Sequence, residues 1–142
     1  MKIENIKFRG KRTDDGAWVY GDLTHVQRIC TKEQTEKSGR RTEPAVRIAN
    51  YNVDEDTIGQ FIGMTDKNEN EIYEGDIIKT DDGLDISGYY EVSYDIGTTG
   101  FICVGKDVHC PIGVIEELSD IVVVGNIYDN KELLTQEYEK ND

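Results

Sequence analysis

Histidine and cysteine are scarce in this chain of 142 residues, which has two histidines and three cysteines. The cysteines are odd in number and lack the spacing of a disulfide framework, so we expect reduced thiols. None of the spacings gives the two-residue knuckle of a zinc site. The soft ligands concerned are His25, Cys30, Cys103, His109 and Cys110. Buried thiols and surface imidazoles explain them, and we predict no metal site and no cofactor.

A catalytic constellation is also missing from the sequence. There is no GxSxG elbow, and two histidines leave little scope for a nucleophile activated by a neighbouring base. The carboxylate pairs Asp81-Asp82 and Glu116-Glu117 are what chance gives in so acidic a chain, and we interpret them as solvated surface. We therefore predict that the protein is not an enzyme and has no catalytic residues. A site assembled between subunits stays open.

Long apolar runs are absent as well. No run approaches the length that crosses a bilayer, and the N-terminal residues MKIENIKFRG lack the apolar stretch of a signal peptide. We therefore expect a cytoplasmic protein without membrane contact. The length fits one domain, or a small core domain with an appendage, and a charged fraction of 32% suits a small domain with much surface.

The net charge of −13 is distributed unevenly along the chain. Residues 1–50 carry 11 Lys and Arg against 7 Asp and Glu, a net charge of +4, whereas residues 51–142 carry 5 against 22, a net charge of −17. Phosphate repels a protein that is acidic overall, which disfavours general nucleic-acid binding. The basic N-terminal third could instead bind an acidic partner, including the acidic part of a second copy.

The N-terminal third predicts a β-hairpin followed by a loop. Apolar and charged residues alternate over 6–9, the turn sequence Asp14-Asp15-Gly16 follows, and alternation resumes over 18–20. Residues 23–29 could continue as a strand. Residues 31–45 have no large apolar side chain and contain Gly39 and Pro44, so we expect a mobile polar loop there, with a short strand at 46–51 after it.

The remainder predicts a small β-barrel. The stretch 58–80 is typical of two strands joined by a polar turn, the alternation over 90–94 predicts a half-buried strand, and 101–104 predicts the strand that returns after a turn. Residues 121–124 are continuously apolar and β-branched, which predicts a strand buried on both faces. Short strands with tight turns favour an SH3-like or Greek-key-like barrel over 56–130. The fold class is thus mainly β, with an N-terminal β-hairpin extension in 1–55 and a short C-terminal helix and tail in 131–142.

Two ligand-loop templates fail on inspection. Asp66, Asn68 and Asn70 alternate as in a calcium loop, but the turn glycine and the chelating Glu of that template are replaced by Glu71 and Ile77. A hairpin turn explains the three residues, because Asp and Asn tolerate left-handed backbone. The segment 100–106, GFICVGK, lacks the hydroxyl that follows the lysine of a phosphate loop, and its apolar centre favours a strand.

Two glycines and one aspartate have structural interpretations. Gly75 is expected to supply a positive φ or a bulge, and Gly125 a bulge or a close approach. Asp76 is expected to accept backbone N–H bonds that brace the start of a strand.

Several segments carry a family resemblance through their order and joint presence. They are Lys7-Phe8-Arg9, Trp18-Val19-Tyr20-Gly21-Asp22-Leu23, Ile58-Gly59-Gln60-Phe61-Ile62-Gly63 with Asp66-Lys67-Asn68, Glu71-Ile72-Tyr73-Glu74-Gly75-Asp76-Ile77, and Val124-Gly125-Asn126-Ile127-Tyr128-Asp129-Asn130 with Glu132-Leu133-Leu134. Together they resemble the YopX family of phage and prophage proteins over nearly the full length. The resemblance implies a mobile-element protein of a bacterial host cell with a largely β fold and self-association. It implies no catalytic residue and no substrate.

Three functional hypotheses follow, the first of which we favour. It is a self-assembling binding or scaffolding module, in which a basic N-terminal hairpin docks on the acidic barrel of a neighbour and the homo-oligomer closes into a ring where the rotation permits. The second is an acidic inhibitor of a host protein that mimics nucleic acid, and the third is nucleic-acid binding through the N-terminal region. The candidate interaction surface consists of Lys7, Arg9, Lys11, Arg12, Trp18 and Tyr20.

Overall fold

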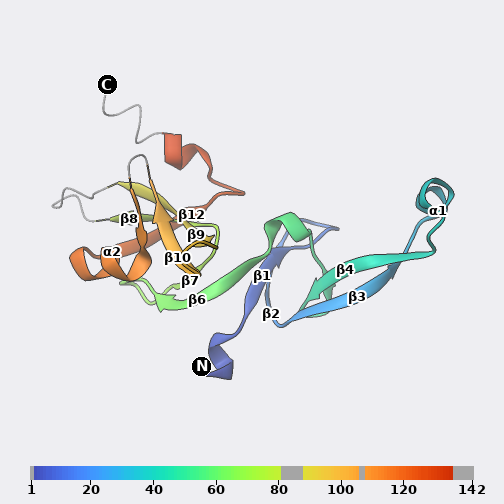
Figure 1. Ribbon diagram of the computed structural model, residues 1–142, viewed down its shortest axis with the longest axis horizontal. Helices are drawn as coiled ribbons and strands as arrows, with labels where there is room; N and C mark the ends of the chain where they lie inside the picture. The colour runs from blue at the N-terminus through green and yellow to red at the C-terminus, as the bar shows by residue number, and fades with distance from the viewer. Residues whose placement is uncertain (1, 81–87, 106–107, 136–142) are drawn as a thin grey trace. The chain divides into compact units, whose positions relative to one another are not determined.

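A computed structural model describes residues 2–80, 88–105 and 108–135 (Figure 1). The fold is mainly β, as the sequence predicts, with a sheet curled into a half-barrel. The chain divides into two compact units, Met1–Gln60 and Phe61–Asp142, here called unit 1 and unit 2. The division lies at 60/61, inside strand β6 (Gly59–Thr65), whereas the sequence placed it at 55/56. No helix among the described residues combines the length and the apolarity needed to cross a membrane.

Unit 1 is built from short strands with one α-helix. Its elements are η1 (Ile3–Asn5), β1 (Phe8–Lys11), β2 (Trp18–Gly21), β3 (Leu23–Ile29), α1 (Lys32–Ser38), β4 (Thr42–Ile48), β5 (Tyr51–Asn52) and η2 (Glu55–Thr57). Strands β1 and β2 pair antiparallel, and the start of β6 pairs with the other edge of β1. Strands β3, β4 and β5 form a second sheet in that order.

The turn between β1 and β2 follows from its side chains. Asp15 Oδ1 accepts a hydrogen bond from the N–H of Ala17 at 2.9 Å, and Gly16 has a φ of 74°, which glycine adopts at no steric cost. Asp14 Oδ1 accepts from the N–H of Asp15 at 2.7 Å. The turn chemistry expected at 14–16 is therefore present.

The expectation of a loop over 31–45 is wrong, because this segment contains a capped helix and most of a strand. Thr31 accepts a hydrogen bond from the N–H of Gln34, whose side chain in turn accepts from the N–H of Thr31. Helix α1 ends at Gly39, which adopts the left-handed conformation. Strand β4 then pairs with β3 over its whole length. A polar, exposed helix and strand need no large apolar residues, so the lack of such residues over 31–45 wrongly indicated a loop.

The predicted strand at 46–51 is interrupted by a tight turn. Ala49 and Asn50 have positive φ values of 51° and 70°, the sign that a type I′ hairpin turn requires at both central positions. The turn places β5 beside the end of β4, where Ile48 pairs with Tyr51. A small core of Val46, Ile48 and Val53 lies beneath, with Phe8, Val19, Leu23 and Ile58 packed against it.

Unit 2 contains the larger sheet. Its elements, after the remainder of β6, are β7 (Glu71–Tyr73), β8 (Asp76–Thr80), β9 (Tyr89–Asp95), β10 (Gly100–Val104), β11 (His109–Pro111), α2 (Ile112–Leu118) and β12 (Ile121–Asn126). The order in the sheet is β11-β10-β9-β8-β12, with all neighbours antiparallel. Residues 132–135 are helical, and the rest of the expected C-terminal helix lies outside the described residues.

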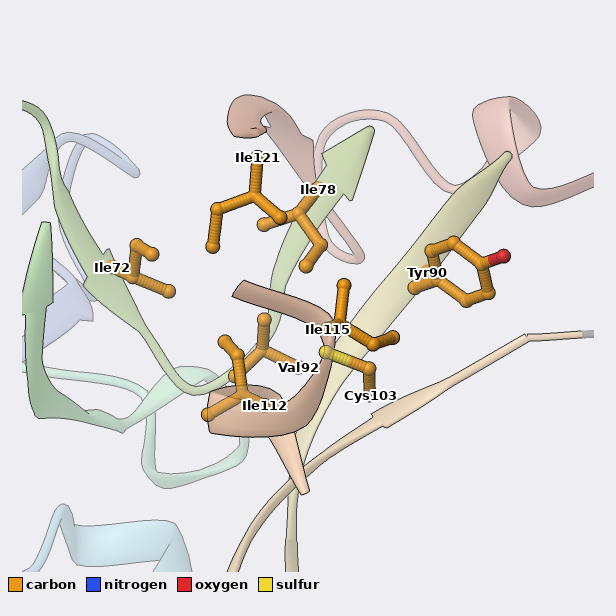
Figure 2. Close-up of a cluster of buried hydrophobic side chains, with 8 residues drawn as sticks. All are labelled: Ile72, Ile78, Tyr90, Val92, Cys103, Ile112, Ile115 and Ile121. Carbon is orange, nitrogen blue, oxygen red and sulfur yellow. The ribbon is translucent and has the colours of Figure 1, made fainter. Parts of the chain in front are cut away.

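Helix α2 covers the apolar face of this sheet. Figure 2 shows Ile112 and Ile115 of α2 directed toward side chains from the strands. The buried cluster consists of Ile72, Ile78, Tyr90, Val92, Cys103, Ile112, Ile115 and Ile121. Burial of so many large apolar side chains is the main stabilising term of this unit, at roughly 1.5–3 kcal/mol for each fully buried aliphatic side chain.

The polar turn between β6 and β7 is tied to the sheet by one carboxylate. Asp66 is 5% exposed, and its oxygens accept from the N–H groups of Asn68 and Asn70, both at 2.9 Å, and from that of Val123 in β12 at 3.0 Å. Burial alone would raise the pKa of Asp66, but these hydrogen bonds outweigh it and the pKa is lowered. The expected hairpin turn is thus confirmed, with Asp66 as its structural anchor, but its left-handed residue is Glu69, with a φ of 66°, rather than an Asp or Asn.

The structural interpretations of the two glycines and Asp76 are confirmed. Gly75 has a φ of 91°, and Asp76, 1% exposed, accepts the N–H of Tyr73 through Oδ2 at 2.8 Å. At Gly125 the register of β12 shifts, and a Cβ there would lie 2.5 Å from the side chain of Asn130. Each of these residues has a local cause that the sequence contained.

Candidate interaction surface

Four of the six candidate residues share one face of the β1–β2 pair. Arg9 lies directly opposite Tyr20, and Lys11 directly opposite Trp18. Opposite residues of an antiparallel pair lie on the same face, and so do residues two apart. The other face carries Phe8 and Val19, which pack on the core of unit 1. The alternation over 6–9 therefore placed Phe8 and Arg9 on opposite faces correctly, whereas for 18–20 the sequence did not say which face meets the core.

The indole ring of Trp18 contacts two cations on this face. The guanidinium of Arg9 lies 4.8 Å from the ring centroid and the ammonium of Lys11 5.4 Å from it, both within cation–π range. Arg9 is only 5% exposed, whereas Tyr20 is 52% exposed. In this structure Arg9 does not offer its charge to solvent, and its contact with Trp18 is part of the fold. Lys7, Lys11 and Trp18 are half-buried.

Arg12 lies apart from this group and is engaged by its own turn. Its Nε and Nη2 donate to the two oxygens of Asp14 at 2.9 and 2.6 Å, and its guanidinium stacks 4.1 Å from the ring centroid of Tyr51. The side-chain hydrogen bond from Arg12 lowers the pKa of Asp14. The positive charge of Arg12 is therefore compensated locally, and a partner would gain less from it than the sequence suggests.

The structure joins the segment 31–45, which the sequence predicted as a loop, to its flanking strands in one basic element. We call residues 23–48, which are β3, α1 and β4, the arm. It carries 6 Lys and Arg against 3 Asp and Glu, a net charge of +3, and Arg40, Arg41 and Arg47 are exposed on it. Within unit 1 the arm runs out from the β1–β2 pair as a two-stranded ribbon that ends in α1 (Figure 1). The excess of Arg and Lys over 28–47 was the available signal.

The thiols of unit 2 have the character of core residues. Cys103 is 0% exposed and lies opposite the half-buried Cys110 in the β10–β11 pair. Burial raises the pKa of Cys103 to about 12, with a smaller contribution from Cys110, so its thiolate is not available near neutral pH. His25 and His109 are exposed. Among the described residues, no three His, Cys, Asp or Glu side chains gather in a way that could hold a metal ion.

A hollow of about 230 Å³ lies beside the arm in unit 1. It is lined by Thr13, Arg28, Glu43, Pro44, Ala45, Val46, Asn52, Val53 and Glu55. Its Arg28 forms an ion pair with Glu43, the residue directly opposite in the β3–β4 pair. The lining has neither a histidine nor a cysteine, so a general base here would have to be Glu43 or Glu55, and a hydroxyl nucleophile would have to be Thr13.

Three comparisons place the chain among known proteins. The family model described as "YopX protein" matches residues 7–135. Protein EF1440 from Enterococcus faecalis has a similar crystal structure, with a TM-score of 0.54 and 24% sequence identity, over 91% of this chain and 97% of that one. At this identity the likeness concerns the fold alone. No curated protein matches the sequence significantly.

Proposed function

The chain belongs to the YopX family, and from that premise we propose that it is a non-enzymatic phage or prophage protein that assembles with itself as a binding or scaffolding module. The proposal places it in the cytoplasm of a bacterial host cell, without a cofactor. The observation that carries it is the division of charge between the two units. Unit 1 has 11 Lys and Arg against 10 Asp and Glu, a net charge of +1, and unit 2 has 5 against 19, a net charge of −14.

This division supports contact between unlike units of neighbouring copies. Two copies of unit 2 repel each other, whereas the exposed cations of the arm attract a neighbour's unit 2. Contact between different surfaces of identical chains is heterologous, and it closes into a ring when the rotation between copies permits. The cations best suited to this role are Arg40, Arg41 and Arg47, because Arg9 is buried and Arg12 is compensated by Asp14.

The finer architecture belongs to the same proposal. We infer that unit 2 is a Greek-key-like barrel, in which α2 and β11 form the connection that returns the chain to β12. Support comes from the strand order, since β8, β9 and β10 follow one another and β12 lies beside β8. The β1–β2 pair is then the hairpin extension of the SH3-like or Greek-key-like scheme.

The experiment measures molar mass by light scattering at about 50 mM and about 500 mM salt, concentrations at which the screening length differs by roughly threefold. We expect a higher molar mass at low salt than at high salt, because screening weakens the attraction between unlike units of neighbouring copies. Arg40→Glu with Arg41→Glu should weaken the oligomer at low salt. The matched control is Lys67→Glu with Lys131→Glu, which makes the same change in net charge on unit 2 and should leave the oligomer intact.

Two outcomes contradict the proposal. A monomer at every concentration in low salt would end self-assembly. Equal weakening by both double variants would show that total charge, rather than its division between the units, controls association. A salt-dependent mobility shift of DNA that the arm variant abolishes would favour the nucleic-acid hypothesis instead.

A further inference from the structure

Strand β3 is the edge strand of its sheet, whose order is β3-β4-β5. The C=O of Val46 accepts the N–H of Val53 on the far side of β4, and Val46 lies opposite His25. Hydrogen-bonded and non-hydrogen-bonded pairs alternate in an antiparallel ladder, so the pairs at His25 and Gln27 are non-hydrogen-bonded. The N–H and C=O groups of these two residues therefore point away from β4. Among the described residues, none forms a backbone pair with this outer edge of β3.

The opposite edge of the arm is protected in two ways. Strand β5 covers the end of β4, and Pro44 stands where a free N–H would otherwise face outward. The outer edge of strand β3 has neither a covering strand among the described residues nor a proline. The strand has only one charged residue, Arg28, over the seven residues LTHVQRI, and it is rich in residues suited to a strand. The exposed edge of β3 is thus an open template for another strand.

We propose that β3 pairs antiparallel with β3 of a second copy of this chain, about a two-fold axis at Val26. The proposal rests on the self-association proposed above, and it adds an isologous contact through β3 to the heterologous contact between unlike units. An isologous pair of this kind is the commonest form of homodimer interface, and it satisfies the edge groups of both copies at once.

The register follows from the sequence of the strand. With Val26 opposite Val26 of the partner subunit, all seven residues overlap, and His25 lies opposite Gln27 of the partner subunit. The N–H and C=O groups of His25 that point away from β4 then face those of Gln27 of the partner subunit, and the two residues can exchange hydrogen bonds. Arg28 lies opposite Thr24 of the partner subunit, so no like charges face each other. A shift that centres the axis on His25 places two imidazoles opposite each other and shortens the overlap.

The same register covers the most exposed apolar side chain of the arm. Ile29 is 81% exposed, and in this register it lies opposite the partner's Leu23, which in its own chain borders the core of unit 1. A two-stranded ribbon is marginally stable in water, whereas four strands with a shared face support one another. Pairing therefore stabilises the arm as well as joining two copies. The contact is narrow, so we expect a dimer that dissociates on dilution.

The first test removes the outward N–H group of residue 27, and its control removes the same side chain but keeps that group. Gln27→Pro should abolish the concentration-dependent dimer in light scattering at about 500 mM salt, where charge attraction is screened. Proline is tolerated at an edge position whose N–H faces solvent, so the circular dichroism spectrum should be unchanged. Gln27→Ala is the matched control. It keeps the N–H and should keep the dimer.

The second test detects the two-fold axis directly and is independent of the proline variant. Paired residues of a non-hydrogen-bonded pair have Cα atoms about 4.5 Å apart, within the range of a disulfide. Val26→Cys should therefore form a covalent dimer with oxidised glutathione. Thr24→Cys, which faces Arg28 of the partner subunit rather than itself, should not, and neither should the unsubstituted protein.

The outcomes separate this inference from the proposed function. A dimer unchanged by Gln27→Pro, or covalent dimers as abundant from Thr24→Cys as from Val26→Cys, would overturn β3 pairing. An oligomer that dissolves completely in high salt would overturn it too, while leaving self-assembly by charge intact. A monomer at every concentration and salt would overturn both. Loss of the dimer only in Gln27→Pro, with cross-linking only at Val26→Cys, is the result expected.

Discussion

The two units of this protein differ in how they are held together. Among the described residues, unit 2 has a core cluster of eight buried residues, contributed by α2 and the strands, and its main sheet has five strands. The core cluster of unit 1 has three buried residues. Unit 1 instead extends its strands into an arm whose distal part has little core beneath it. We infer from this difference that unit 2 is the more stable unit and carries most of the negative charge, whereas unit 1 carries exposed strand edges and cations.

The largest expected effect tests whether the units are separate in stability. Ile48 in unit 1 and Ile78 in unit 2 are both 0% exposed, so Ile48→Ala and Ile78→Ala are matched truncations. Each should cost about 2–5 kcal/mol. Hydrogen exchange should accelerate in unit 1 for the first variant and in unit 2 for the second. Acceleration in both units by either variant would show one cooperative structure and remove the comparison.

A somewhat smaller effect is expected at the turn that closes unit 2. Asp66→Ala leaves the N–H groups of Asn68, Asn70 and Val123 without their acceptor, and hydrogen bonds to a charged group contribute roughly 1.5–3 kcal/mol. We expect a loss of about 3 kcal/mol in denaturant unfolding. Asp95→Ala is the control. Asp95 also accepts within a turn, from Thr98, but in an exposed setting, and its loss should cost less than about 1 kcal/mol.

Acid should reproduce part of the Asp66 effect. The folded-state pKa is lowered, so the unfolded state takes up the proton first as pH falls. The stabilisation is complete above the ordinary carboxyl pKa of about 4, and it is lost as pH falls through the lowered value. Denaturant midpoints between about pH 5 and pH 2 should fall less in Asp66→Ala than in the parent protein. An identical acid dependence in both would show that Asp66 does not contribute.

The sequence predicted those features whose causes are local. The turn at 14–16, the positive φ of Gly75 and the bracing carboxylate of Asp76 each depend on a few neighbouring residues. The strand at 121–124 is present within β12, but the prediction that it is buried on both faces is wrong. Ile121 is buried whereas Val124 is 38% exposed, because β12 is the edge strand of its sheet. Alternation also separated the apolar from the charged face of β1, because period-two patterning survives wherever one face meets a core.

Within the arm, α1 and the first part of β4 were missed because residues 31–45 have no local apolar signal. Strand β4 begins at Thr42 only because β3 is there to pair with it, and that pairing is between residues up to 25 apart.

In the candidate surface, Arg9 was expected to be exposed, since an arginine side chain on a strand normally is. Its burial against Trp18 is tertiary and has no trace in the spacing. The compensation of Arg12 by Asp14, two residues away, was open to prediction.

The smallest effect concerns the thiol at the centre of unit 2 and tests whether that core excludes water. Cys103 ionises in the unfolded chain near its ordinary pKa of 9.0, but in the folded protein only near about 12. Its neutral form therefore favours the folded state fully below pH 9, and this contribution is lost as pH rises toward 12, at about 1.4 kcal/mol per unit. Denaturant midpoints measured from about pH 8 to pH 10.5 should decline less steeply in Cys103→Ala than in the parent protein. Iodoacetamide should label Cys103 only on unfolding, because the reactive thiolate is not formed in the core.

The outcome that would contradict this prediction is an equal decline of the denaturant midpoint with pH in both proteins, together with rapid labelling of the folded protein. It would mean that the core of unit 2 opens to solvent and that unit 2 is not the more stable unit.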